Sequence, residues 1–142
     1  MSSPDHGSEL VLDAWPVLEW VKGREPARSF FHRIIEDAVA NRVVLSMSRI
    51  NHGEVIYSIR KDFPANRIDQ ALKAFAEIPI QLHSVDDGLV DDAVALKSVY
   101  PISYADAFAV SLALRLRVPL ITGDPELRRL SLVDFRLEWV GP

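Results

Sequence analysis

The stretch from Pro101 to Leu127 reads P-I-S-Y-A-D-A-F-A-V-S-L-A-L-R-L-R-V-P-L-I-T-G-D-P-E-L and decides which fold we expect. Apolar residues recur at helical spacing after Ser103, which predicts an amphipathic helix with Asp106 in its first turn. The apolar run from Val118 to Thr122 predicts a short buried strand, and Asp124 follows it closely. The stretch therefore predicts a helix and a strand that each present a carboxylate at one end.

The rest of the chain alternates in the same way between short apolar runs and helical patterns. Further strands are expected at 10–12, 43–45, 78–83 and 135–140, and helices at 16–21, 26–40, about 48–61, 66–77, 86–98 and 127–130. This alternation is typical of the α/β class, with a mostly parallel central sheet and helices on both faces. We expect a flexible tail at 1–9 and a single domain at 10–142.

Composition narrows the classes of function. The 142 residues include no cysteine, which excludes disulfides, thiolate zinc sites and a cysteine nucleophile. The net charge of −4 argues against broad wrapping of nucleic acid, although a bound cation would reverse the sign locally. No apolar run has the length of a membrane span, and the first residues lack a signal peptide pattern. We therefore expect a cytoplasmic protein with no membrane partner.

Three aspartates stand at predicted element ends, namely Asp13, Asp106 and Asp124. Each has a simple structural explanation as a helix cap or as an acid in a helix first turn, and this explanation is favoured for Asp106 and Asp124 taken alone and plausible for Asp13. Ser103 and Asp106, three residues apart, have the spacing of a capping box. Pro125 after Asp124 suits the first position of a helix.

Glu54 is harder to explain as a surface residue. It shares a predicted helix face with Ile50 and Tyr57, and we expect that face to be apolar and buried. A buried carboxylate costs several kcal/mol unless a cation or hydrogen bonds compensate. Asn51 is positioned to orient it, while the alternative is a glutamate at the rim that reaches solvent or pairs with Arg49.

If the helix acids face the strand ends, four carboxylates from four elements converge: Asp13, Glu54, Asp106 and Asp124. In parallel sheets, ligands bind beyond the carboxyl ends of the strands, which is where Asp13 and Asp124 are expected. Four ionised carboxylates share a pocket only if a cation lies among them. Mg²⁺ is the natural occupant, with Mn²⁺ able to substitute, because both prefer oxygen ligands.

Four segments, in this order, resemble the PIN-domain ribonucleases and, among them, the VapC toxins of bacterial toxin–antitoxin pairs. The segments are V-L-D-A-W-P-V-L-E-W with Asp13, S-R-I-N-H-G-E-V with Asn51 and Glu54, I-S-Y-A-D-A-F-A-V with Ser103 and Asp106, and L-I-T-G-D-P-E-L with Thr122 and Asp124. The resemblance spans nearly the whole chain from Val11 onward. Glu19 departs from it as an acid where similar chains are often apolar, and no role is assigned to it.

This resemblance implies a PIN-like three-layer sandwich and Mg²⁺-dependent hydrolysis of RNA phosphodiester bonds. Asp13 and Asp106 would be the most direct metal ligands, with Glu54 and Asp124 completing the site. Ser103 and Thr122 match positions that support the acids in similar proteins. It also implies a VapB-type antitoxin that binds the helical surface near the site, and a possible homodimer.

Two other functions suit parts of the pattern. A receiver-like module phosphorylated on aspartate also uses an α/β sheet with acids at strand ends and Mg²⁺. It would have paired acids after the first strand and a lysine after the last core strand, whereas Asp13 stands alone and Gly123 follows Thr122. The second alternative is a PIN-like module that binds RNA or protein without cleaving it.

Overall fold

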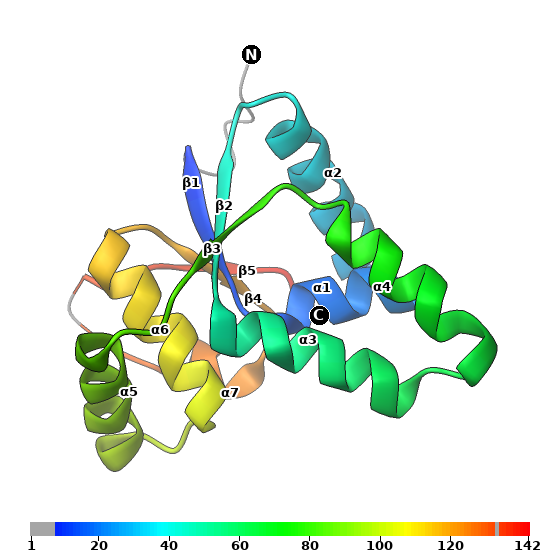
Figure 1. Cartoon of the computed structure of the whole chain (residues 1–142). Helices are drawn as coiled ribbons and strands as arrows, with labels where there is room; N and C mark the ends of the chain where they lie inside the picture. The colour runs from blue at the N-terminus through cyan, green and yellow to red at the C-terminus, as the bar shows by residue number, and fades with distance from the viewer. Residues whose placement is uncertain (1–7, 133) are drawn as a thin grey trace.

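A five-stranded sheet with helices on both faces forms the centre of the computed structural model, which describes residues 8–132 and 134–142 (Figure 1). Its strands are β1 (Glu9–Leu12), β2 (Val44–Ser48), β3 (Ile80–His83), β4 (Leu120–Thr122) and β5 (Leu137–Trp139). The order is β3-β2-β1-β4-β5, and every neighbouring pair is parallel. The expected α/β class with a parallel central sheet is confirmed.

Helices cover the sheet in two layers. They are α1 (Ala14–Lys22), α2 (Ala27–Val39), α3 (Arg49–Asp62), a 3₁₀ turn (Ala65–Arg67), α4 (Ile68–Ala76), α5 (Asp87–Val99), α6 (Tyr104–Leu116) and α7 (Pro125–Arg128). Helices α1 to α4 lie on one side of the sheet, and α5 to α7 lie on the other (Figure 1). Among these described helices, none combines the length and apolar character needed to cross a membrane.

Side-chain alternation along the central strand explains the two layers. Leu10 and Leu12 of β1 belong to the core under α1 to α4, while Val11 between them belongs to the core under α5 to α7. All three side chains are fully buried. A strand buried on both faces is continuously apolar, which is why the sequence pattern predicts it well.

Several element ends differ from the expected ones. Strand β2 continues to Ser48, since it pairs with β3 as far as the Ser48 and His83 partners. Helix α1 begins at Ala14, two residues early, because Asp13 caps it. Strand β5 is shorter than expected, and α7 begins at Pro125. The expected tail lies largely outside the described residues, and the division into a tail and one domain stays a prediction.

The strand order changes direction at the central strand. From β1 the chain moves outward through β2 and β3, then returns to the other side of β1 for β4 and β5. Loops that leave the carboxyl ends of β1 and β4 therefore turn to opposite sides, which is the position where α/β proteins typically bind ligands. Asp13 follows β1, and Asp124 lies two residues beyond the end of β4.

Close packing at this edge depends on Gly123. A Cβ atom there would lie 2.2 Å from the ring of Trp15, far inside van der Waals contact. The indole ring of α1 thus lies directly on the backbone that follows β4. This contact brings the start of α1 next to the loop that carries Asp124.

Candidate metal centre

Asp13 lies at the carboxyl end of the central strand and is only 1% exposed. Its Oδ1 accepts a hydrogen bond from the backbone N–H of Trp15 at 3.1 Å, so it is the N-cap of α1. Its Oδ2 accepts from the hydroxyl of Thr122, which in turn accepts from the backbone N–H of Asp124 at 3.0 Å. The Thr122 hydroxyl therefore links the ends of β1 and β4.

Asp106 occupies the first turn of α6 and is 6% exposed. The expected capping box forms only in part. Ser103 Oγ accepts from the backbone N–H of Asp106 at 3.1 Å, but no hydrogen bond joins the Asp106 carboxylate to Ser103 in the described part of the chain. The carboxylate lies instead within hydrogen-bonding reach of the Asp124 side chain. Its closest polar neighbour is thus another acid.

Asn51 joins the helix that carries Glu54 to the helix that carries Asp106. It is fully buried, its Oδ1 accepts from Ser48 Oγ at 2.6 Å, and its Nδ2 donates to the carbonyl of Ala105 at 3.0 Å. Ser48 is also the N-cap of α3 and accepts from the Asn51 backbone N–H. This network holds the first turn of α3 against the first turn of α6.

Glu54 is half-buried, and its Oε1 atom is inaccessible to solvent without a hydrogen-bond partner among the described residues. The sequence-based reason for its burial was wrong. Ile50 and Tyr57 are 39% and 59% exposed, and the buried face of α3 is instead made by Asn51, Val55 and Ile59. Glu54 lies at the border of that face.

The alternative pairing of Glu54 with Arg49 is not seen. Arg49 Nη1 contacts His52 Nδ1 at 3.3 Å instead. Glu54 therefore faces the other acids without an arginine partner in the described chain.

Burial and mutual repulsion hold these carboxyl groups toward their protonated forms. Desolvation by burial raises the pKa of Asp13 to about 8, and the charges of Asp124 and Glu54 add to it, although the Thr122 and Trp15 hydrogen bonds oppose the shift. Desolvation, followed by the Asp124 side chain, raises the pKa of Asp106 to about 9. Desolvation also raises the pKa of Glu54, while the nearby Asn51 side chain opposes the shift.

The charges of Asp13, Glu54, Asp106 and Asp124 influence the pKa values of one another, so the four acids lie in the same region although separate elements carry them. A divalent cation fits this donor set. Hard cations prefer carboxylate oxygens, and Glu54 Oε1 is a buried acceptor without a donor. Positive charge among the groups would also favour their ionised forms.

The structure adds Glu126, which the sequence analysis did not select. One carboxylate oxygen each from Asp106, Asp124 and Glu126 lies within 4.8 Å of the others. The sequence does not distinguish Glu126 from an ordinary acid in the first turn of a short helix. Its only sequence signal is its position two residues after Asp124, where a helical turn brings both side chains to the same end.

Other charged residues singled out in the sequence have structural roles. Glu19, to which the sequence assigned no role, forms an ion pair with Arg24 at 3.4 Å. Asp86 caps α5 and makes two hydrogen bonds to Arg115, at 2.9 and 3.1 Å. Asp86 thus stands at the start of the helix that the sequence predicts at 86–98.

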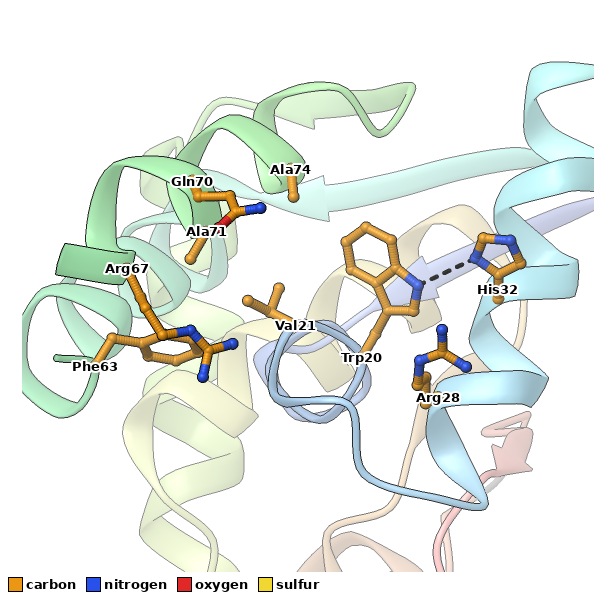
Figure 2. Close-up of a pocket in the computed structure, with 9 residues that line it drawn as sticks. All are labelled: Trp20, Val21, Arg28, His32, Phe63, Arg67, Gln70, Ala71 and Ala74. Carbon is orange, nitrogen blue, oxygen red and sulfur yellow. Dashed lines mark hydrogen bonds between the residues drawn. The ribbon is translucent and has the colours of Figure 1, made fainter.

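A separate concave site lies among α1, α2 and α4, and none of the clustered acids lines it. The cavity measures about 260 Å³ and is lined by Trp20, Val21, Arg28, His32, Phe63, Arg67, Gln70, Ala71 and Ala74. Figure 2 shows Phe63 and Arg67 on one side and Arg28 and His32 on the other, with Trp20 between them. Trp20 Nε1 donates to His32 Nδ1 at 3.3 Å, which fixes one wall. We call it the arginine-rimmed pocket.

Comparison with known proteins decides the family. The family model described as PIN domain matches residues 10–132. This chain belongs to the PIN domain family. The PIN match covers all four acids and gives no support to the receiver-like alternative. No curated protein matches the chain in sequence.

Solved structures with the same fold include VapC-type toxins and VapBC complexes. A VapBC complex from Rickettsia felis bound to promoter DNA has a TM-score of 0.68 at 14% identity and covers 92% of this chain and 97% of its own. A sarcin–ricin-loop-cleaving VapC toxin from Mycobacterium tuberculosis has a TM-score of 0.68 at 11% identity, covering 88% and 97%. A VapBC complex from nontypeable Haemophilus influenzae has a TM-score of 0.62 at 20% identity, covering 92% and 97%. This PIN domain therefore has the VapC-type fold over nearly its whole length.

Proposed function

We propose that this PIN-domain protein is a Mg²⁺-dependent endoribonuclease and the toxin of a toxin–antitoxin pair. The observation that carries the proposal is the gathering of four carboxylates from four elements at one sheet edge, with a buried Glu54 oxygen that lacks a donor. A PIN family match over residues 10–132 and the similarity to an RNA-cleaving toxin support the choice of substrate.

A bound Mg²⁺ would activate a water molecule and offset charge on the phosphoryl oxygens during hydrolysis. The acidic residues of the chain would hold the ion. Asp13 is held by Trp15 and Thr122, so its carboxylate cannot rotate freely. Asp106 faces Asp124, and together they present oxygens at this edge of the sheet.

Glu54 has a distinct part in this mechanism. Its Oε1 is inaccessible to solvent and has no donor among the described residues, so a bound cation would give this oxygen the positive partner that it lacks. Burial raises its pKa, which makes it a better proton acceptor than an exposed glutamate. Asn51 joins α3, the helix that carries Glu54, to α6 through its hydrogen bond to the Ala105 carbonyl.

RNA cleavage by the purified protein tests the proposal. We expect cleavage of a single-stranded RNA with Mg²⁺ or Mn²⁺, none with EDTA, and a loss of at least about 1,000-fold in Asp106→Asn, because a metal ligand stabilises the transition state by several kcal/mol. The substitution keeps the shape of the side chain, and circular dichroism checks the fold. RNA that is bound but left intact in either metal would favour the non-cleaving alternative.

We also propose a VapB-type antitoxin as the partner. Two similar structures are VapBC complexes bound to DNA. The arginine-rimmed pocket supports this choice, because its apolar walls and its two arginines suit an apolar side chain next to an acidic residue. Co-purification with the product of a neighbouring gene would show the pair. A homodimer and a cytoplasmic location stay predictions.

A further inference from the structure

Arg128 is an exposed arginine beside the acid cluster, which consists of Asp13, Glu54, Asp106 and Asp124. It is the last residue of α7, and its backbone N–H donates to the carbonyl of Asp124 at 3.3 Å. Four residues of helix rise by about 6 Å, so this arginine lies close to Asp124. Among the described residues, Arg128 nevertheless forms no ion pair. Its positive charge is therefore not neutralised by the neighbouring acids.

The ring of Trp139 holds the guanidinium of Arg128. The guanidinium carbon lies over this ring at 4.5 Å from its centre, the shortest of the three arginine–aromatic contacts among the described residues. The indole is held in turn, because its Nε1 donates to the carbonyl of Pro142 at 3.3 Å and a Cβ atom at Gly141 would lie 2.5 Å from its ring. A cation–π contact uses the face of the ring and leaves the N–H donors of the guanidinium unused. Arg128 is thus positioned before any ligand binds.

Strand pairing places Trp139 next to the residues that support the acids. Trp139 is the register partner of Thr122, and the backbone N–H of Val140 donates to the Thr122 carbonyl at 3.0 Å. The Thr122 hydroxyl donates to Asp13. Partners in register point to the same side of a sheet, so the indole ring and the Thr122 hydroxyl share one face. The pair of Trp139 and Arg128 therefore borders the acid cluster on the side of β5.

An RNA strand needs positive charge at this edge of the sheet. Every phosphate of the strand is negatively charged, and the acids repel the phosphates that a bound cation does not reach. An arginine that is held in place and has free donors suits bidentate binding of a phosphate. Arg24 and Arg115 lack this freedom, because they are paired with Glu19 and Asp86. Arg128 combines the position and the free donors.

We propose that Arg128, held by Trp139, binds a phosphate group of the RNA strand next to the bond that is cleaved. The inference rests on the proposed ribonuclease function and adds to it a residue that positions the substrate. Trp139 is a positioning residue, since it acts through the arginine. A phosphate contact fixes the register of the strand and carries no information about base sequence.

RNA binding tests this role separately from cleavage. Fluorescence anisotropy measures the affinity of a short labelled single-stranded RNA for protein with Asp106→Asn, which should leave the RNA intact. Arg128→Met keeps an apolar side chain on the indole without the charge, and Arg128→Lys keeps the charge. Arg33→Met is the matched control. Arg33 is exposed on α2, on the other side of the sheet from α7 (Figure 1), and lies over the Phe30 ring at 5.8 Å.

We expect Arg128→Met to weaken RNA binding about tenfold at low salt, because it removes a charge-assisted hydrogen bond to phosphate. The slope of log affinity against log salt concentration should become smaller by about 0.7, which corresponds to one phosphate contact with a single strand. Arg128→Lys should keep the slope of the parent protein and lose part of the affinity, since an ammonium group cannot bind in a bidentate manner. Arg33→Met should match the parent protein in both quantities.

Equal affinity and equal salt slope in Arg128→Met and Arg33→Met would overturn the inference and leave the proposed function intact. A smaller slope in Arg128→Met, together with RNA that the wild type leaves uncut in Mg²⁺ and Mn²⁺, would support the phosphate contact and refute the ribonuclease function. Protein that neither binds nor cuts RNA would refute both. Melting temperatures check the fold of each variant, and Arg128→Gln, with the same expected slope, replaces Arg128→Met if that variant is unfolded in the assay.

Discussion

The acid cluster and the arginine-rimmed pocket have opposite chemistry. The cluster gathers carboxylates at the carboxyl ends of β1 and β4, where Asp13 and Asp106 are almost fully buried. The pocket has apolar and aromatic walls with two arginines, and α1, α2 and α4 provide it. One site lacks positive charge, and the other presents it at its rim.

On the proposed function, this difference assigns hydrolysis and antitoxin binding to different parts of the molecule. The cluster depends on strand ends and helix first turns, which the sheet positions rigidly. The pocket depends on side chains along three helices. Variants in one region should therefore leave the other function largely intact, and the following predictions test that separation.

Among the variants that test this separation, the largest effect is expected for Thr122→Val, which keeps the shape but removes the hydroxyl that links Asp13 to Asp124. Loss of a residue that orients metal ligands typically costs 10- to 100-fold in metal affinity or activity. Because the hydroxyl lowers the pKa of Asp13, its loss should also move the pH profile of cleavage upward. Cleavage rates at several pH values measure both effects.

Ser111→Ala is the matched control for this substitution. Ser111 is 2% exposed on α6, and its Oγ has no hydrogen-bond partner in the described chain. Removing it should leave cleavage unchanged and stability equal or slightly higher. Equal activity of Thr122→Val and Ser111→Ala would contradict the linking role of Thr122.

A smaller effect is expected for Arg28→Glu at the pocket rim. Reversal of an exposed charge should weaken antitoxin binding about tenfold, mainly through slower association, and the loss should shrink at high salt. Arg33→Glu, on the same helix but outside the pocket, should bind normally. Surface plasmon resonance measures the rates. Reduced RNA cleavage by free Arg28→Glu would argue against separate sites.

The smallest effect concerns the pH dependence of stability in EDTA. The folded pKa values of about 8 for Asp13 and about 9 for Asp106 exceed the ordinary value of 3.8, so between these limits the folded state binds more protons than the unfolded state. Stability is therefore highest at the acidic end of this range and falls as pH rises. We expect each of the two groups to contribute a loss of up to about 1.4 kcal/mol per pH unit between about pH 5 and 8.

Urea unfolding with EDTA measures this slope, and saturating Mn²⁺ should reduce or reverse it because cation binding favours ionised carboxylates. Asp106→Asn should flatten the slope in EDTA. An unchanged slope in that variant would show that Asp106 is not its origin.

Sequence patterns predicted much of the fold because local rules decide it. Buried parallel strands are continuously apolar, as Leu10 to Leu12 are, and Ser48, Asp86 and Ser103 cap helices as their residue types predict. Predictions failed where tertiary contacts overrode periodicity. Ile50 and Tyr57 are exposed although their spacing with Glu54 suggested a buried face, because α3 packs with the face of Asn51, Val55 and Ile59 inward.

By itself, the sequence determined which elements form, in which order, and which acids stand at their ends. Only the tertiary structure decided which groups meet. The aspartates at 13 and 124 both cap helices through Oδ1, so capping and membership of the cluster are compatible roles that a local pattern treats as alternatives. The proximity of Asp106, Asp124 and Glu126 depends on how α6 and α7 pack beside the sheet. Such long-range packing cannot be read from the spacing of residues along the chain.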